Sequence, residues 1–504
     1  MVSNPIQWHS LRGVLRFALT DREMQRRLVI TGLLLFIVNA ASYLPLPGVD
    51  KKALSNLFDQ LALGKYGLSA LDFLTRPGAM RHMSLFNLGL APFFSACLWL
   101  QLASVVIPTL KRHSFGGEHG RAAIARMTYL LTVILCLVWS YFGSLHVEKL
   151  DAGLSTKWAT SSILTIHGGT FQVVAMVSMT AATLLLLYIG GLITEYGIGN
   201  GVALIAIVDL DFPTKLYLAG RDMFIWSGQN QELQGLIITF LVVFFIGVVW
   251  LMYFITTRVK AVKIEHDGRN STIPLRPGMV GKVPLAWAMS VVYLPISLAA
   301  FIKIPWLKEL GIKLGAHSIV FTMLLIMLIV VFTYVYALIV FNARLVEDLT
   351  RRYGYSLIRN NRTSGRQILD VEKRKVLVIT SLVLIGATLT PLFASAWLKI
   401  PPRVGGVLGG IHLIIFIGVL ADVVSHLGFY KNKNESSTKD WSISYIAFDE
   451  IEATVKSEFL KSNGIPALVE PLRFTWGMPI RTIVDQYRIY VPLSKRDEAR
   501  GLIV

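Results

Sequence analysis

Long apolar segments dominate this chain and decide what it can fold into. A helix that crosses the roughly 30 Å hydrocarbon core of a bilayer needs about 17–25 predominantly apolar residues. Such runs recur along the sequence at about 28–44, 84–109, 124–145, 169–193, 201–217, 235–257, 284–306, 317–343, 375–398 and 407–429. They predict ten transmembrane helices and hence an all-α polytopic membrane protein. The weakest run is 201–217, which contains two acids near its far end.

The composition excludes a soluble or disordered protein. Charged residues make up only 16% of the chain and hydrophobic residues 54%, whereas a typical soluble domain has about 25% charged residues. The two cysteines, Cys97 and Cys136, both lie inside apolar runs. Their placement predicts buried thiols and offers neither a disulfide framework nor the ligand spacing of a zinc site.

The distribution of Lys and Arg orients the predicted helices. Ten spans place both termini on the same side of the membrane. The N-terminal segment and the loops 110–126, 194–200, 258–282 and 344–375 together carry 24 Lys and Arg, against 14 in the alternate loops. Because basic loops stay in the cytosol, both termini are expected there. A division into halves of five spans, at about 11–217 and 235–429, predicts inverted repeats, since five is odd.

The character of the sequence changes after span ten. Residues 430–440 form a polar stretch that is typical of a flexible linker. Residues 441–504 then alternate between short strand and helix patterns. Strands are predicted at 441–448, 465–469 and 487–491, with helices from Asp449 to Ser462 and from 495 to 502. We therefore predict a small cytosolic α+β domain of β-α-β-β-α order, called the C-terminal module below.

No catalytic motif is found, which predicts that the chain is no enzyme and needs no cofactor or metal. The turn Gly197–Gly201 lacks the lysine and the preceding strand of a phosphate-binding loop. Asp422 is the one acid deep inside a run, so the spans lack the mid-depth charges of an ion-coupled pump. This pattern favours a passive conduit. The alternative is a ten-span secondary transporter of a small solute, built on the same inverted halves.

Six segments, in this order, resemble the SecY protein-conducting channel over about residues 11–429. They are Tyr43-Leu44-Pro45-Leu46-Pro47-Gly48, Ser84-Leu85-Phe86-Asn87-Leu88-Gly89-Leu90-Ala91-Pro92, Ile193–Gly201 (ITEYGIGNG), Ile273-Pro274-Leu275-Arg276, Leu338–Arg344 (LIVFNAR) and Gly409–Ile415 (GGIHLII). No single one is specific, but the ordered series is. The resemblance implies the central pore-forming subunit of a channel in the bacterial inner membrane, which moves unfolded polypeptides across that membrane or sideways into it.

The resemblance also implies roles for particular residues. A narrow pore would be lined at its constriction by apolar side chains, at positions Leu90, Phe94, Val202, Ala206, Ala286 and Ile415. A lateral gate would lie between spans two and three and spans seven and eight. A plug would precede span two, which assigns that role to segment 67–83. Its matching residues are Leu71, Phe73, Leu74, Pro77 and Gly78; from the pattern alone, this segment reads equally well as an ordinary outer loop.

The two large basic loops would meet cytosolic partners. In the family such loops bind the motor ATPase SecA or the ribosome. Small SecE-like and SecG-like membrane subunits complete the channel. The other expected partners are unfolded polypeptide with a signal sequence and membrane lipid; DNA is not expected as a partner. The corresponding basic residues here are Arg258, Lys260, Lys263, Arg276, Arg344, Arg351, Arg352, Arg359 and Arg362. The family's Arg-Pro-Gly string is replaced by Arg359-Asn360-Asn361-Arg362.

The C-terminal module is not part of the usual channel. It faintly resembles a small bacterial signal-transducing module with a ferredoxin-like or PII-like outline. A short linker would keep it beside the basic loops, where an acidic face at Asp449, Glu450 and Glu452 could contact them. The hypothesis is that it modulates or replaces access by the cytosolic partner; a passive appendage is the alternative.

Overall fold

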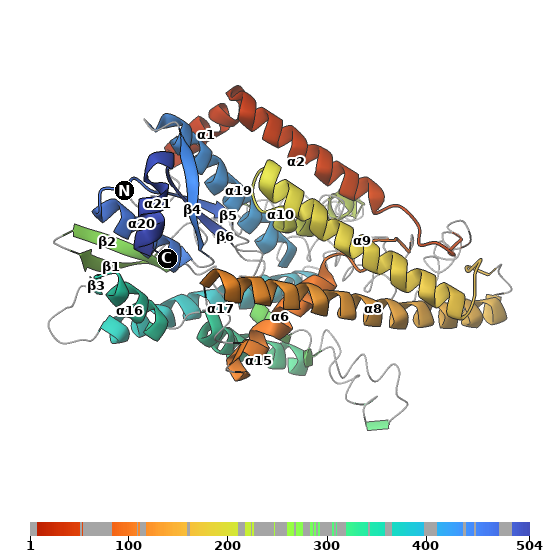
Figure 1. Ribbon diagram of the computed structural model, residues 1–504. Coiled ribbons are helices and arrows are strands. Elements are labelled where there is room, and N and C mark those ends of the chain that lie inside the picture. The colour runs from red at the N-terminus through yellow and green to blue at the C-terminus, as the bar shows by residue number, and fades with distance from the viewer. Residues whose placement is uncertain are drawn as a thin grey trace. The chain divides into compact units, whose positions relative to one another are not determined.

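The protein forms two compact units, and each is described by itself. The N-terminal unit is Asp21–Tyr217, and the C-terminal unit joins Met1–Thr20 to Leu218–Val504. The computed structural model (Figure 1) describes residues 8–50, 53, 83–107, 109–110, 117–158, 162–209, 217–222, 224–225, 246, 260–266, 269–275, 283–285, 287–288, 291–292, 305–306, 309, 319–340, 343–357, 365–397, 411–436, 440–447, 450–472 and 486–503.

The described part of the N-terminal unit is helical. Its helices are α2 (Arg22–Ala41), α6 (Ala91–Val106), α8 (Gly117–Trp158), α9 (Gly169–Tyr196) and α10 (Gly201–Asp209). α8 packs against both α6 and α9, while α2 packs against α9 and α10. Local signals set the starts: the Asp21 side chain accepts a hydrogen bond from the Met24 N–H at 3.1 Å, and Pro92 lies in the first turn of α6.

The predicted membrane spans are confirmed in part. Within the described ranges, four helices are long and apolar enough to cross a membrane: Arg22–Ala41, Ala122–Lys149, Gly169–Tyr196 and Ile319–Ala337. The runs at 84–109, 201–217, 375–398 and 407–429 also contain described helices. The run at 235–257 lies outside the described residues, apart from residue 246. The number of ten therefore stays a prediction.

The Gly197–Gly201 turn joins α9 to α10 and is fastened to α2. The Thr31 hydroxyl accepts a hydrogen bond from the Ile198 N–H at 2.9 Å, and Arg27 donates to the carbonyl oxygens of Glu195 and Gly197. The Asn200 side chain accepts from the N–H groups of Val202 and Ala203, which caps α10. The turn therefore serves helix packing, as expected from its lack of a phosphate-loop lysine.

The C-terminal unit combines predicted membrane helices with two small sheets. Its first part contains α1 (Trp8–Thr20), β1 (Lys260–His266), β2 (Arg269–Leu275), α15 (Ile319–Val340), α16 (Ala343–Arg352), β3 (Ser356–Leu357), α17 (Gly365–Trp397) and α19 (Ile411–Glu435). β1 and β2 form an antiparallel hairpin, and β3 pairs with the other edge of β1. The two loops expected to meet cytosolic partners thus share one sheet.

The C-terminal module has the predicted β-α-β-β-α order. It comprises β4 (Trp441–Ala447), α20 (Glu450–Ser462), β5 (Leu468–Leu472), β6 (Gln486–Pro492) and α21 (Arg496–Ile503). β6 lies between β4 and β5 and is antiparallel to both. β5 begins three residues later than predicted. The reason is the end of α20, where Gly464 has a φ of 75° and the Ile465 N–H donates back to the Leu460 carbonyl.

Span ten is longer than expected. α19 continues beyond residue 429 to Glu435, into the segment expected to be a flexible linker. Lys431 and Glu435 form an i,i+4 ion pair at 3.7 Å along this extension. The first part of the connection to the module is therefore helical.

The crossing of α9 and α10 provides a test of packing. A Cβ at Gly201 would collide with the Gly190 carbonyl oxygen and come within 2.7 Å of the Ile193 Cβ. We expect Gly201→Ala to lower the free energy of unfolding by roughly 1–3 kcal/mol, the usual cost of overpacking. Gly191→Ala is the matched control, because its Cβ would meet nothing within 4 Å. Thermal unfolding in detergent measures both; equal stability of the two variants would contradict the packing.

Candidate functional site

Five of the six predicted constriction residues lie on or directly before three described helices. Leu90 immediately precedes α6 and is fully buried, and Phe94 lies one turn later, with its N–H donating to the Leu90 carbonyl at 3.0 Å. Val202 and Ala206 are one turn apart on α10. Ile415 is buried on α19, in the other unit. Ala286 lies outside the described residues, so the ring itself stays a prediction.

The predicted plug residues, Leu71, Phe73, Leu74, Pro77 and Gly78, lie outside the described residues. The two ends of their loop, however, are joined. The Leu46 N–H donates to the Met83 carbonyl at 2.8 Å, and the Leu85 N–H donates to the Leu44 carbonyl at 2.9 Å. Two of the family-like strings, 43–48 and 84–92, therefore pair with each other. Sequence reasoning missed this pairing because it has no local signature.

An apolar cluster supports this junction. Leu46, Val49, Ile163, Leu164 and Phe171 are buried together there. Gly48 has a φ of 92°, and a Cβ on it would lie 3.1 Å from the Phe171 ring. The Asp151 carboxylate accepts a hydrogen bond from the Ile163 N–H at 2.6 Å and so satisfies a buried backbone group beside the cluster. The start of span two is thus held at a fixed place within the N-terminal unit.

Some of the basic residues of the two large loops lie on described helices and strands, and the others lie outside the described residues. Lys260 and Lys263 lie on β1, and Arg344, Arg351 and Arg352 lie on α16. Arg351 and Arg352 are exposed in the last turn of α16, where positive charge suits the helix dipole. Arg258, Arg276, Arg359 and Arg362 lie outside the described residues.

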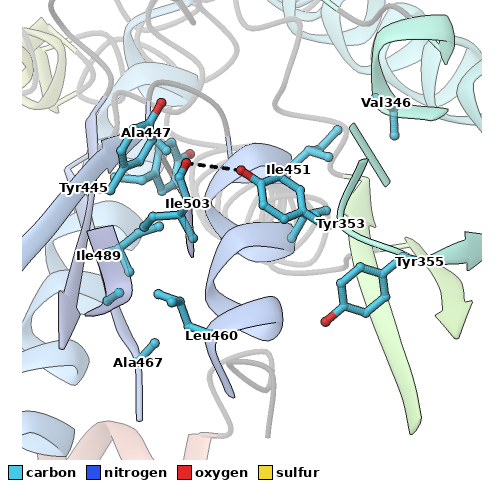
Figure 2. Packing of buried hydrophobic residues seen from close by; sticks show 14 of the residues in the cluster. Val346, Tyr353, Tyr355, Tyr445, Ala447, Ile451, Leu460, Ala467, Ile489 and Ile503 are labelled. Carbon is cyan, nitrogen blue, oxygen red and sulfur yellow. Dashed lines mark hydrogen bonds between the residues drawn. The ribbon is translucent and has the colours of Figure 1, made fainter. Parts of the chain in front are cut away.

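The C-terminal module packs on these loops through apolar side chains. Figure 2 shows one buried cluster that contains Val346, Tyr353 and Tyr355 of the 344–375 loop beside Ile451, Ile503 and other residues of the module. The Tyr353 hydroxyl donates to the Ile503 carbonyl at 3.2 Å, and its ring lies 5.0 Å from that of Phe459. α20 also lies against β2 of the hairpin.

The acidic contact expected from the sequence stays a prediction. Glu452 accepts a hydrogen bond from Tyr445 at 2.8 Å and pairs with Lys456 at 3.3 Å, both inside the module. Asp449 lies outside the described residues. Aromatic and aliphatic groups contribute to the contact with the loops, and their attraction comes from removing apolar surface from water.

A buried carboxylate joins the module to span ten. Glu470 on β5 is almost completely buried, and its Oε1 accepts from His426 Nε2 at 2.9 Å and from the Tyr430 hydroxyl at 3.2 Å, both on α19. Its Oε2 accepts from the Tyr490 hydroxyl at 3.0 Å, and Arg488 lies 3.6 Å away. The carboxylate thus has partners from both the helix and the sheet.

The surroundings of Glu470 keep it ionised. Burial alone raises the pKa of this carboxyl, but the hydrogen bond and charge of His426, with Arg488 and Tyr490, outweigh burial and hold the pKa below its ordinary value of 4.5. Burial and the neighbouring Glu470 raise the pKa of Tyr490 to about 12, so that hydroxyl stays a donor. Sequence reasoning missed this network. The sequence has one local sign of it: Glu470 lies between Leu468 and Leu472 on the same face of the strand, where an apolar residue would be expected.

The sequence of the channel part matches a family model. Residues 84–424, more than half of the chain, match the model described as SecY. The chain belongs to the SecY family. This match confirms the expected resemblance and, with it, the assignment of the chain to protein translocation.

Individual relatives agree with this membership. The protein translocase subunit SecY of Chlamydia muridarum is 25% identical over 435 residues, which cover 82% of this chain and 95% of the relative. The subunit of Escherichia coli K12 is 26% identical over 425 residues, covering 80% and 91%. A solved SecY structure, described for its plug domain, has a TM-score of 0.47 at 16% identity and covers 80% of this chain and 92% of its own.

Glu470 makes stability depend on pH. Because its pKa in the folded protein lies below 4.5, the stabilisation it provides is fully present at higher pH and is lost as the pH falls through the folded pKa. Glu470→Gln should remove charge-assisted hydrogen bonds worth roughly 1.5–3 kcal/mol at pH 7. The free energy of unfolding of this variant should also fall less steeply than that of the wild type as the pH drops below 4.5.

Thermal unfolding at pH 7 and below pH 4.5 measures this difference. Glu435→Gln is the matched control, because Glu435 is exposed on the same helix as His426 and its ion pair is worth only about 0.3–0.5 kcal/mol. A Glu470→Gln protein that is as stable as the control at pH 7, with an unchanged acid dependence, would contradict the network.

Proposed function

We propose that this SecY-family chain forms the pore of a translocation channel for unfolded polypeptides, and that it catalyses no reaction. The match to the family over residues 84–424 is the observation that carries the proposal. In this proposal ten helices form two inverted halves, at about 11–217 and 235–429, with both termini in the cytosol. Cargo leaves across the membrane or through a lateral gate into lipid, which is the better solvent for apolar signal segments.

The barrier to ions would be an apolar constriction. Leu90, Phe94, Val202, Ala206, Ala286 and Ile415 would line it, with segment 67–83 as the plug. A narrow apolar ring excludes water and therefore ions, yet it can widen around an extended chain because its contacts are not directional. The fixed end of the loop at Met83 would give the plug an anchor.

The cytosolic partners would be SecA, the ribosome or both, with SecE-like and SecG-like subunits in the membrane. The 24-to-14 excess of Lys and Arg supports a cytosolic place for the loops 258–282 and 344–375. The exposed Arg351 and Arg352 at the end of α16 would offer charge to an acidic protein surface or to ribosomal RNA.

The constriction is tested by a polar substitution. Ile415→Thr should raise ion leak through the closed channel in proteoliposomes by at least about tenfold, equivalent to about 1.4 kcal/mol of barrier. Leu420→Thr is the matched control, since Leu420 is 53% exposed on the same helix. Equal leak from both variants, with normal thermal stability, would remove Ile415 from the pore.

The partner loop is tested by charge reversal. Arg359→Glu with Arg362→Glu should weaken binding of the motor ATPase or ribosome by at least about tenfold, a loss of 1.4 kcal/mol. The channel should still insert into the membrane. Arg374→Glu with Lys375→Glu changes the charge equally at exposed positions of α17 and serves as the control. If both pairs weaken binding equally, the loss comes from general loop charge and not from the two arginines.

A further inference from the structure

The C-terminal module uses the cytosolic end of span ten as part of its own structure. On β6, Tyr487, Ile489 and Val491 belong to the buried cluster shared with α20 and α21. The alternate residues Arg488 and Tyr490 lie on the opposite face of the sheet, with Glu470 of β5. α19 packs against β5 on this second face. The sheet is therefore covered by module helices on one face and by a channel helix on the other.

The contacts on this second face are specific. Besides His426 and Tyr430, α19 contributes Phe429, whose ring lies 5.5 Å from that of Tyr490. Lys433 lies in the helical extension of α19, with its Nζ 4.5 Å from the centre of the Tyr490 ring. Separation of the sheet from α19 would break the hydrogen bonds that Glu470 accepts from His426 and Tyr430, so these bonds oppose separation.

The first face reaches two other parts of the channel chain. Tyr353 connects α16 to α20 and α21 through Phe459 and the Ile503 carbonyl. α20 lies against β2, and β2 is held to β3 through β1. The module thus touches the end of span ten, the segment after span eight, and the hairpin between spans six and seven.

We infer that the module is a docked clamp, which binds the end of α19, the α16–β3 segment and the β1–β2 hairpin into one body. It is not a domain that moves freely on a tether. A protein that binds these loops must either contact the module as well or displace the module from the loops. Only this last consequence rests on the proposed function, because the docking itself requires no translocation partner.

The clamp is tested by cutting the connection in the full-length protein. Residues 437–439 are replaced by a protease recognition site, membranes containing the protein are digested, and the membrane-bound and released fractions of the module are measured. We expect the wild-type module to stay bound after cleavage. Release of the wild-type module by a simple wash would overturn the inference.

Variants on the channel side leave the sequence of the module untouched. Tyr353→Ala combined with His426→Ala should increase the released fraction by at least about tenfold. Asp348→Ala is the control, because Asp348 is exposed on α16, the helix that also contains Val346 of the shared cluster. Retention of the module in the double variant would overturn the assignment of docking to these contacts.

Hydrogen exchange tests the clamp separately from the docking. In the uncut double variant, backbone amides of the 260–275 hairpin, which neither substitution touches, should exchange at least about tenfold faster than in the Asp348→Ala control. Unchanged exchange would mean that the module docks without holding the hairpin, and the clamp would be rejected. A channel that is inactive in translocation but retains its cut module would refute the proposed function alone.

Discussion

The absence of water in the bilayer core is the constraint on which the rest of this structure depends. Each backbone N–H and C=O in hydrocarbon needs a partner within the protein, so the apolar runs must be helical over their length. A turn that is buried inside the protein has the same requirement, because water is excluded there too, and Ile198 and Asn200 are buried. Between α9 and α10 the chain reverses tightly, and the groups freed by that reversal are taken up by Thr31, Thr194 and Asn200. The Gly197–Gly201 string suggests a ligand-binding loop, but in this structure its backbone N–H groups form hydrogen bonds within the protein.

The elements of the C-terminal module could be predicted from the sequence because their signals are local. Gly464 ends α20, and alternation marks the strands, so the order of elements was correct, and the largest error is in β5, which begins and ends three residues later than predicted. How the module meets the channel could not be predicted in the same way. Glu470, His426 and Tyr353 are separated by long stretches of chain, and each has an ordinary local context. A local acidic face at Asp449, Glu450 and Glu452 was the available guide, and it gave no sign of the aromatic contact.

The same division holds for the channel. Composition and Lys/Arg counts predict spans and orientation, because hydrophobic and electrostatic terms add up residue by residue. The junction of Leu44–Leu46 with Met83–Leu85 requires two strings about forty residues apart to pair, and periodicity contains no information about that. The resemblance to SecY identified both strings as significant without showing that they touch. Pore residues are harder still, because an apolar lining has the same chemistry as a packed core.

The nature of the docking contact decides how a bound module could be removed. An interface made by opposite charges on the surface would weaken as salt screens it. Here the cluster around Tyr353 is apolar, and the carboxylate of Glu470 is buried among its partners. Buried pairs are screened little, so ordinary changes in ionic strength leave both contributions nearly intact. Release therefore requires protonation of Glu470 or a competing protein that replaces the apolar contact. Of these two, a competing protein is the route that operates near neutral pH, since the pKa of Glu470 lies below 4.5.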